Sequence, residues 1–479
     1  MISISRVDLK DESLHYEYKR AKGGLPKSFW ETYSAFANSD GGYIFLGIEE
    51  KEKIKYAPVE LNKDEINDLK EQLFSLANNK EKVSFNLLSD EDVEEIEVDG
   101  LIVLRVHINR CPVEFRPVFI NNNLFQGTYR RNADGDYHCS IDEIKAMLRD
   151  ANIKGQDLVI LEDYSINTLD EETINQYRNI FAAHHPTHPF LKESKAKFLE
   201  FIGAAKLAKD GISYHPTAAG LLMFGFSYRI VYEFPNYFLD YQQIDEIDQN
   251  RWADRLQSDS GEWNGNLFTF FQKVVSKISS NLKIPFQMNG IYRNDDDVMH
   301  KAIREALCNA LCNADYRLIK GVVVKQYLDR IVFKNPGCLM MDVDQMIKGG
   351  TSAPRNNTLL KMFNLIGIGE KSGSGVSTLF ATSKAYKLPL PIIEEQYNPD
   401  SSTLVFYTSN PRKNNNNLLE LEQDILNFVI DNGPSSAKEI SQRLQNNITT
   451  IKLRLYHLVE LGLINTSGTI KDKRYFASK

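Results

Sequence analysis

The amino-acid sequence predicts an α+β protein of several domains. The chain has 479 residues, too many for one hydrophobic core, and its 42% hydrophobic content is that of a globular protein. Short strand-like runs alternate with segments of helical apolar spacing along the chain. A run of asparagines near the C-terminus separates a last module from the rest. We therefore expect about three to four domains.

Changes in composition suggest where these domains begin and end. We expect a first domain over residues 1–152, a connecting region over 153–285, a third domain over 286–410, a polar linker over 411–417 and a last module over 418–479. The connecting region carries no set of side chains that indicates catalysis. In it, helical spacing predicts two helices, over 170–186 and 196–211.

Charge and cysteine content limit the possible functions. The net charge of −7 provides no overall attraction for nucleic acid, so any such binding must come from local basic patches. The five cysteines form no C-x-x-C pair, which argues against zinc and against a disulfide framework. No window approaches the roughly 18 apolar residues of a membrane span, and the N-terminus lacks a signal-peptide core. We expect a cytoplasmic protein without a membrane partner.

Carboxylates converge within the first 50 residues. Apolar spacing around Glu12 and Glu17 suggests a strand, and a glycine turn leads into a second strand that ends at Glu50. Crowded acids repel unless a cation or protons neutralise them, and oxygen ligands suit Mg²⁺ or Mn²⁺. Lys19, two residues beyond Glu17, should face the same side and reach a phosphate. The alternative is that these residues are solvated charges at a strand edge.

These segments resemble the Schlafen AlbA-like domain. Its signature is an acid, four intervening residues, an E-[FY]-K triplet, and then SAFANT-GG, an apolar strand and G-V-[DE]-[DE]. The sequence matches at residues 12–19 and 34–50. In relatives that cleave RNA, two glutamates and an aspartate hold a metal. The glutamates fall on Glu12 and Glu17, whereas Glu50 replaces the aspartate. The resemblance thus implies a metal set of Glu12, Glu17 and Glu50, with Lys19 beside it.

Two basic clusters are candidate nucleic-acid contacts. The first surrounds a glycine turn and consists of Arg20, Lys22 and Lys27, next to Lys19. The second, Arg130 and Arg131, lies in the segment that closes the domain in related sequences. Both clusters have the composition of phosphate contacts. A charged turn is the alternative interpretation of the second cluster.

A second candidate site begins in a helix predicted over 300–316. Glu305 and Asn309 lie four apart on one face of it, where a general base can stand beside a metal-binding amide. An NPG turn and a glycine-rich stretch at 367–376 follow, and glycine-rich turns let backbone amides approach phosphates. The candidate cofactor residues are Asn309, Asn335, Gly337, Arg355, Gly373 and Gly375.

In this order the segments resemble the ATPase domain of gyrases and histidine kinases, in a divergent form that often follows AlbA-like domains. The resemblance implies ATP binding, with Mg²⁺ held by Asn309 and with Glu305 as the base of a weak ATPase. Arg355 stands at the R-N position of that family. Asn335 replaces an aspartate that accepts a hydrogen bond from the adenine amino group, and an amide can do this in only one orientation.

The last module has the pattern of three helices and a hairpin, which describes a winged helix-turn-helix. From residue 411 to 479 there are ten Lys or Arg against seven Asp or Glu. We expect DNA contacts from Lys452 and Arg454 on the third helix and from Lys473 and Arg474 on the wing. Winged helices also serve as dimer contacts. Because two linked sites gain in effective concentration, we expect a homodimer or a higher homo-oligomer.

Two functions compete on this evidence. The first is an ATP-binding transcriptional regulator that binds DNA through the winged helix and RNA or DNA through the AlbA-like domain. The second, implied by the Schlafen resemblance, is a metal-dependent endoribonuclease acting on tRNA or other structured RNA in phage defence. We expect the regulator, because Glu50 departs from the nuclease pattern and the C-terminal module is of a DNA-binding type.

Overall fold

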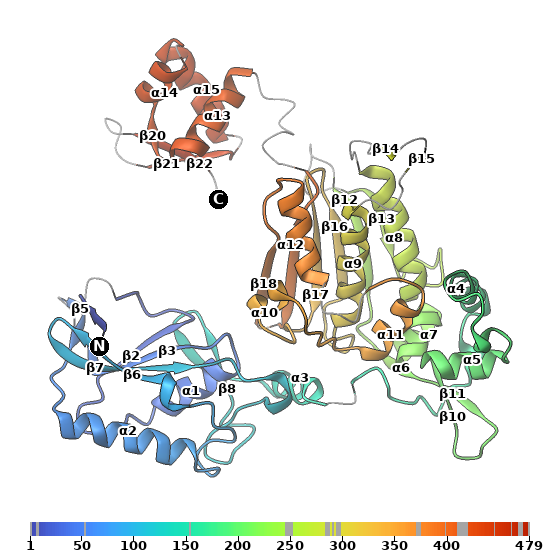
Figure 1. Ribbon diagram of the computed structural model, residues 1–479, viewed down its shortest axis with the longest axis horizontal. Coiled ribbons are helices and arrows are strands. Elements are labelled where there is room, and N and C mark those ends of the chain that lie inside the picture. The colour runs from blue at the N-terminus through green and yellow to red at the C-terminus, as the bar shows by residue number, and fades with distance from the viewer. Residues whose placement is uncertain are drawn as a thin grey trace.

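The computed structural model shows a chain built from both helices and sheets, so the predicted α+β multidomain class is confirmed (Figure 1). It describes residues 2–5, 9–51, 54–152, 155–244, 252–282, 288–289, 292–293, 298–369, 375–397, 399–409, 420–444, 446–460, 462–467 and 473–477. Within these residues no helix combines the length and apolar character needed to cross a bilayer.

The first unit is built on a five-stranded sheet with the order β1-β6-β7-β3-β2. Its strands are β1 (Ile2–Ile4), β2 (Tyr16–Lys19), β3 (Gly42–Leu46), β6 (Val93–Val98) and β7 (Leu101–Ile108). Two hairpins join it, formed by β4 (Ile48–Lys51) with β5 (Ile54–Pro58) and by β8 (Tyr129–Asn132) with β9 (Gly135–His138). Its helices are α1 (Phe29–Ala37), α2 (Lys63–Ala77) and α3 (Ile141–Asp150).

Helix α1 explains why the SAFAN segment has its sequence. Its aromatic residues Trp30, Tyr33 and Phe36 are buried against the sheet. Asn38, also buried, donates from Nδ2 to the carbonyl oxygens of Val118 and Tyr129 and accepts from the Val118 N–H at Oδ1. These bonds satisfy buried backbone groups and fix the start of β8 against the helix. The motif is therefore structural and positions the two arginines of β8.

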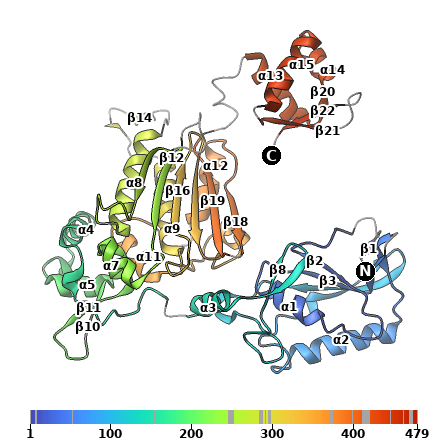
Figure 2. The same ribbon diagram turned by 180° about the vertical axis from the view of Figure 1, so that it is seen from behind.

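The second unit contains a six-stranded sheet with the order β13-β12-β16-β17-β19-β18. Its strands are β12 (Leu239–Ile244), β13 (Trp252–Gln257), β16 (Val322–Gln326), β17 (Arg330–Pro336), β18 (Ile392–Gln396) and β19 (Ser401–Tyr407). The longer helices α8 (Leu267–Asn281), α9 (Val298–Asn313) and α12 (Gly375–Ala385) lie along the sheet, which Figure 2 shows from the opposite side.

Smaller elements complete the second unit. The helices are α4 (Glu171–His184), α5 (Lys195–Ile202), α6 (Ala218–Phe224), α7 (Ser227–Glu233), α10 (Val343–Lys348) and α11 (Asn357–Leu365). Two short hairpins are formed by β10 (Ala205–Leu207) with β11 (Tyr214–Pro216) and by β14 (Met288–Asn289) with β15 (Tyr292–Arg293).

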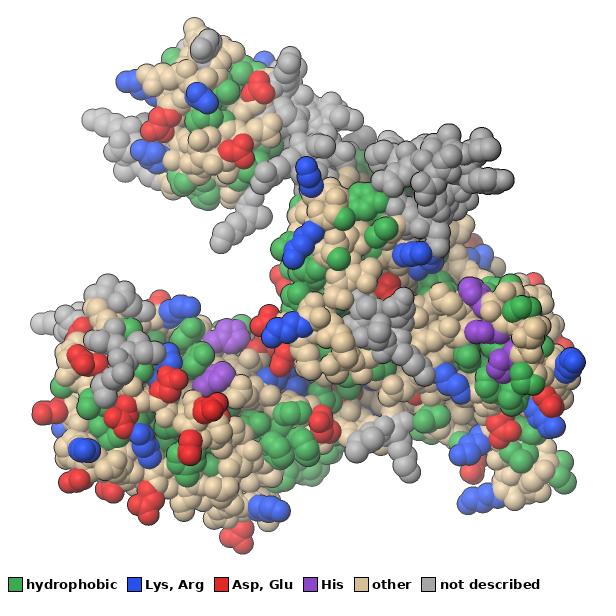
Figure 3. All heavy atoms as spheres, in the orientation of Figure 1, with side chains coloured by type: hydrophobic (Ala, Val, Ile, Leu, Met, Phe, Trp, Pro, Cys, Tyr) green, Lys and Arg blue, Asp and Glu red, His purple; other side chains and the backbone are tan. Residues whose placement is uncertain are grey.

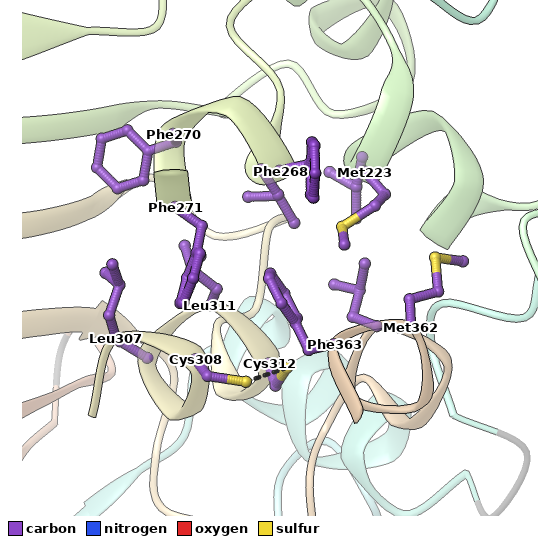
Figure 4. Close-up of a cluster of buried hydrophobic side chains, with 14 of the residues drawn as sticks. Met223, Phe268, Phe270, Phe271, Leu307, Cys308, Leu311, Cys312, Met362 and Phe363 are labelled. Carbon is purple, nitrogen blue, oxygen red and sulfur yellow. Dashed lines mark hydrogen bonds between the residues drawn. The ribbon is translucent and has the colours of Figure 1, made fainter. Parts of the chain in front are cut away.

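The predicted boundary between residues 285 and 286 is wrong. Strand β12, from the expected connecting region, pairs in parallel with β16 from the expected third domain. A single hydrophobic core runs from Leu161 to Phe406. Figure 4 shows its centre, where Met223 of α6 and Phe268 of α8 lie near Phe363 of α11. Residues 155–409 therefore share one core.

Two further sequence expectations can be compared with this core. The predicted helix over 196–211 is shorter in the structure, because α5 ends at Ile202 and is followed by Gly203, whose φ of +93° suits a left-handed helix stop. All five cysteines are buried free thiols. Cys308 and Cys312 lie on α9 with 3.9 Å between their sulfur atoms (Figure 4).

The third unit begins after the linker region 411–417, which lies outside the described residues. It comprises α13 (Glu420–Asn432), α14 (Ala437–Arg443) and α15 (Ile448–Glu460) with β20 (Ser435–Ser436), β21 (Ile464–Ser467) and β22 (Arg474–Ala477). The strands form one sheet with the order β20-β22-β21, and a separate core packs beneath them. The order of three helices and a hairpin agrees with the sequence prediction.

Candidate nucleotide pocket and carboxylate site

A pocket in the second unit brings together residues that lie far apart in the sequence. Predicted residues Glu305, Asn309, Asn335 and Gly375 all line it. Its walls come from α9, the ends of strands β17 to β19, the start of α12 and the segment 338–354. The sequence motifs of the second candidate site thus converge on one cavity.

Helix α9 presents Glu305 and Asn309 to this pocket because its other face is buried. Ala302 and Ile303 are covered by the core. The face of α9 that carries Glu305 and Asn309, four residues apart, is therefore turned towards the cavity. At Gly375 an added Cβ would overlap the Asn309 amide and lie 2.7 Å from Glu305 Oε1. Glycine is therefore required where α12 starts against these two side chains.

Asn335 supplies an unpaired acceptor in the pocket wall. Its side-chain Nδ2 donates to the Ala310 carbonyl oxygen at 2.6 Å. A carbonyl only accepts, so this bond fixes the orientation of the amide. Oδ1 is buried and has no hydrogen-bond partner among the described residues. The orientation that the sequence left open is therefore the one in which Oδ1 remains an unpaired acceptor.

Two predicted nucleotide contacts have a different role. Arg355 is 3% exposed and forms a two-bond ion pair with Asp150 of α3, at 2.7 and 2.9 Å. It also donates to the Cys338 carbonyl at 2.8 Å, and a Cβ on Gly337 would lie 2.8 Å from its guanidinium. Arg355 and Gly337 therefore shape the pocket wall from behind. Gly373 lies outside the described residues.

The predicted carboxylates of the first unit lie near one another. Burial raises the pKa of Glu12, and the negative charges of Glu17 and then Glu50 raise it further. Only residues from Tyr16 onwards form the strand, and Glu12 precedes it, with Oε1 accepting from the Tyr18 N–H at 3.2 Å. Glu12 is therefore near enough to Glu17 and Glu50 for their charges to affect it, although it lies outside the strand.

These carboxylates do not form a metal site as they are arranged. Lys19 donates to Glu17 Oε1 at 2.8 Å, so the two residues face the same side as predicted. Arg131 donates to Oε2 of the same carboxylate, also at 2.8 Å. Both oxygens of Glu17 are thus held by cations of the protein. In the part of the chain that the structure describes, no three His, Cys, Asp or Glu side chains are placed to share a metal ion.

The prediction that Arg130 and Arg131 contact phosphates is wrong. Arg131 is 1% exposed and also pairs with Asp136 at 2.9 Å. Arg130 is 5% exposed and pairs with Asp400 of the second unit at 2.5 Å. The composition of the segment suggested a basic surface patch, but the side chains of Arg130 and Arg131 are buried in ion pairs with acidic residues. Because Asp400 is distant in the sequence, no local pattern reveals this pairing.

The other basic cluster remains at the surface. Arg20, Lys22 and Lys27 are exposed. Glu49 lies 2.5 Å from Lys51 and 3.3 Å from Arg20. The pKa of Glu49 is lowered by its hydrogen bond with Lys51 and by the positive charges of Lys51, Arg20 and Lys22. The single carboxylate of Glu49 thus faces several basic side chains, and the cluster keeps a net positive charge. Figure 3 shows acidic and basic side chains mixed on the face of the molecule that it draws.

In the third unit, two of the four predicted DNA contacts pair with acidic residues of the protein and two are exposed. Arg454 pairs at 3.3 Å with Glu422, which is buried, and Arg474 lies 3.5 Å from Glu439. Lys452 and Lys473 are exposed. Leu453 and Tyr456 are also exposed on α15, at 62% and 64%. The outer face of the third helix is therefore more apolar than its composition suggested.

Comparison with known families now defines the class of protein. Residues 12–140 match the family described as "Schlafen, AlbA_2", and residues 320–405 match "Putative ATP-dependent DNA helicase recG C-terminal". Residues 145–240 match a "Domain of unknown function (DUF8451)". The chain therefore combines a Schlafen AlbA_2 domain with an ATPase-like domain of the recG C-terminal type. This confirms the two resemblances read from the sequence.

Solved structures include two similar chains. The crystal structure of a Corynebacterium diphtheriae protein has 15% identity and a TM-score of 0.41, covering 98% of this chain and 82% of that one. The solution structure of the N-terminal domain of a RecG-related protein from Nitrosomonas europaea has 30% identity and a TM-score of 0.22, covering 28% and 87%. None of the curated proteins matches the chain.

Proposed function

We propose that this protein is an ATP-binding, nucleic-acid-binding regulator. The observation that carries the proposal is the convergence of Glu305, Asn309 and Asn335 on one pocket. The unpaired Oδ1 of Asn335 is suited to accept a hydrogen bond from the 6-amino group of adenine. Guanine has an oxygen at that position, which would face this acceptor without a proton. The pocket should therefore favour ATP over GTP.

Asn309 would hold Mg²⁺ on the nucleotide, and the ion would offset the phosphate charge. Gly375 lets α12 start directly against Asn309 and Glu305, which keeps both side chains at the pocket. Glu305 lines the same pocket and is the candidate base if ATP is hydrolysed. We propose that nucleotide occupancy, with at most slow turnover, is the signal to which the regulator responds.

Nucleic acid would bind at two separate surfaces. In the AlbA_2 domain the exposed cluster of Arg20, Lys22 and Lys27 would contact phosphates of RNA or DNA. In the third unit the exposed Lys452 and Lys473 would contact DNA. We also infer a homodimer, which would place two such units on one DNA molecule. Light scattering of the full chain at micromolar concentration tests the dimer, and a monomer would contradict it.

Equilibrium binding of ATP and GTP to the full chain, with Mg²⁺, tests the nucleotide proposal. We expect ATP to bind more tightly than GTP. Asn309→Ala should weaken ATP binding by about tenfold or more, because a bond to a charged group is lost. Asn236→Ala is the matched control, since Asn236 is an exposed asparagine outside the pocket lining. Failure of the wild type to bind ATP would refute the proposal.

The alternative function is a metal-dependent endoribonuclease. The proximity of Glu12, Glu17 and Glu50 favours it, whereas the occupied oxygens of Glu17 oppose it. Incubation of the wild type and Glu17→Gln with total tRNA and Mn²⁺ or Mg²⁺, with and without ATP, separates the two. Discrete fragments that vanish in the variant would establish the nuclease. Intact tRNA that still binds in a salt-sensitive manner would support the regulator.

A further inference from the structure

Strand β8 carries two neighbouring arginines that reach two different sites. Adjacent residues on a strand point to opposite faces, so Arg130 and Arg131 leave β8 in opposite directions. Arg131 enters the AlbA_2 domain and holds Glu17. Arg130 leaves the domain and enters the second unit. In both Figure 1 and Figure 2, β8 lies on the side of the first unit that faces β18.

The contacts of Arg130 end at the wall of the nucleotide pocket. Its guanidinium pairs with Asp400, lies over the Tyr397 ring at 4.8 Å and approaches the Cys338 sulfur at 3.7 Å. Cys338 and Leu339 are both lining residues of the pocket. The guanidinium therefore contacts Cys338, a residue of the pocket wall.

A second arginine of the first unit holds the same wall. Arg110, which follows β7, donates to the Leu339 carbonyl at 3.0 Å and forms a two-bond ion pair with Glu395. Glu395 in turn accepts from the Leu339 N–H at 2.6 Å. Both peptide groups of Leu339 are thus fixed by an ion pair between the two units. A shift of this wall must displace Arg110, Arg130 or both.

At the other end, Arg131 sets the charge of the carboxylate site. It is bound by Glu17 and Asp136, and its Nε donates to the Ser13 carbonyl at 3.0 Å. Any displacement of β8 must therefore change how Glu17 is neutralised, next to the basic cluster of Arg20 and Lys22. Buried ion pairs have few alternative arrangements, which makes such a strand a stiff connection.

We propose that β8 couples the nucleotide pocket to the nucleic-acid surface of the AlbA_2 domain, through Arg130 on one face and Arg131 on the other. This inference rests on the proposed function and names how that function is regulated. By thermodynamic linkage, ATP then changes the affinity for nucleic acid, and nucleic acid changes the affinity for ATP by the same factor.

The test measures this factor in the full chain. We would titrate fluorescein-labelled bulk tRNA with and without saturating ATP, and ATP with and without saturating tRNA. For the wild type we expect both ratios to agree at about fivefold or more. Equal affinities in the presence and absence of the second ligand would overturn the coupling while leaving both binding activities intact. No binding of ATP or of tRNA by the wild type would instead refute the proposed function.

Two variants locate the coupling. Arg130→Gln should reduce the factor to about one while ATP and tRNA still bind separately. Arg149→Gln is the matched control, because Arg149 also crosses the interface, to Asp315 at 2.8 Å, but neither residue lines the nucleotide pocket. Asp400→Asn, which keeps an acceptor for Arg130, replaces the first variant if that one fails to fold. Equal factors in the variants and the control would overturn the role of β8.

Discussion

The two candidate sites differ in how their polar groups are satisfied. In the AlbA_2 domain both oxygens of Glu17 are bound by Lys19 and Arg131, so the protein supplies its own counter-charges. In the ATPase-like domain Asn335 keeps an acceptor without a partner in the described residues, and it does so in a pocket wall. An unmet buried acceptor is costly unless a ligand meets it. The second site is therefore the better candidate for a small-molecule ligand.

The largest effect should come from removing the internal counter-charge of the first site. Arg131→Met leaves the Glu17 and Asp136 carboxylates without their buried partner. We expect a loss of about 3–5 kcal/mol in the free energy of unfolding, measured by urea denaturation of the first unit. Arg105→Gln is the control, since its partner Glu94 is exposed and the pair should contribute about 0–1 kcal/mol. Equal losses would show that Glu17 does not depend on Arg131.

A smaller effect is expected at the unpaired acceptor. Asn335→Asp loses the donor to the Ala310 carbonyl and turns a carboxylate oxygen towards it. We expect about 1–3 kcal/mol of destabilisation by denaturant unfolding, whereas ATP binding should be retained because the carboxylate still supplies an acceptor for the adenine amino group. Asn432→Asp makes the same change at an exposed amide that donates to the Phe428 carbonyl. Loss of ATP binding in a folded Asn335→Asp variant would contradict the role of residue 335 as an acceptor for the adenine amino group.

Chelation sharpens the comparison between the sites. Because Glu17 is neutralised by protein cations, EDTA should leave tRNA binding unchanged. ATP affinity should fall by about tenfold, the equivalent of one bond to a charged group. Fluorescence anisotropy with each ligand, before and after EDTA and after added Mg²⁺, measures both. Loss of tRNA binding on chelation would show that the carboxylates take a metal after all.

The smallest effect concerns acid sensitivity of the interface. Burial would raise the pKa of Glu395, but its hydrogen bonds and ion pair with Arg110 outweigh this and lower the pKa. A lowered carboxyl pKa gives stability that is full above the ordinary value and lost as pH falls through the folded value. Asp40 beside it has a raised pKa, from burial and from Glu395, so it gains its proton first.

We therefore expect the first and second units to separate below about pH 4. Small-angle scattering of the full chain between neutral pH and pH 3 would show the radius of gyration rising in that window. In Glu395→Gln the contact between the first and second units should be weaker at neutral pH, and the radius of gyration should rise less on acidification. An acid transition of equal size in this variant would assign the change to other carboxylates.

Sequence patterns predicted local features better than distant pairings. The helix carrying Glu305 and Asn309 and the order of elements in the third unit both follow from apolar spacing and motif order. Of the cofactor residues predicted from motif order, Asn309, Asn335 and Gly375 line the pocket. Gly337 and Arg355 lie behind its wall. Arg130 and Arg131 were misassigned because a basic pair has the same composition whether it meets phosphates or buried acids.

Other features depended on contacts that no local pattern contains. Arg110, Glu395 and Asp400 were not identified, because each gains its role only when the two units meet. The boundary at 285 failed because β12 finds its parallel partner β16 across α8 and α9. Parallel pairing requires such a long connection, and composition changes within it without marking a domain end.

The pairing of β12 with β16 determines which fragments of the chain are usable. A fragment that starts at 286 would keep β16 but lose both β12 and β13, and the unpaired edge of β16 would be open to other chains. It would also lose Leu239 and Phe268 from the core. Such a fragment should aggregate on expression, whereas a longer fragment that starts near residue 155 keeps the whole six-stranded sheet and is the better choice for crystallisation with ATP.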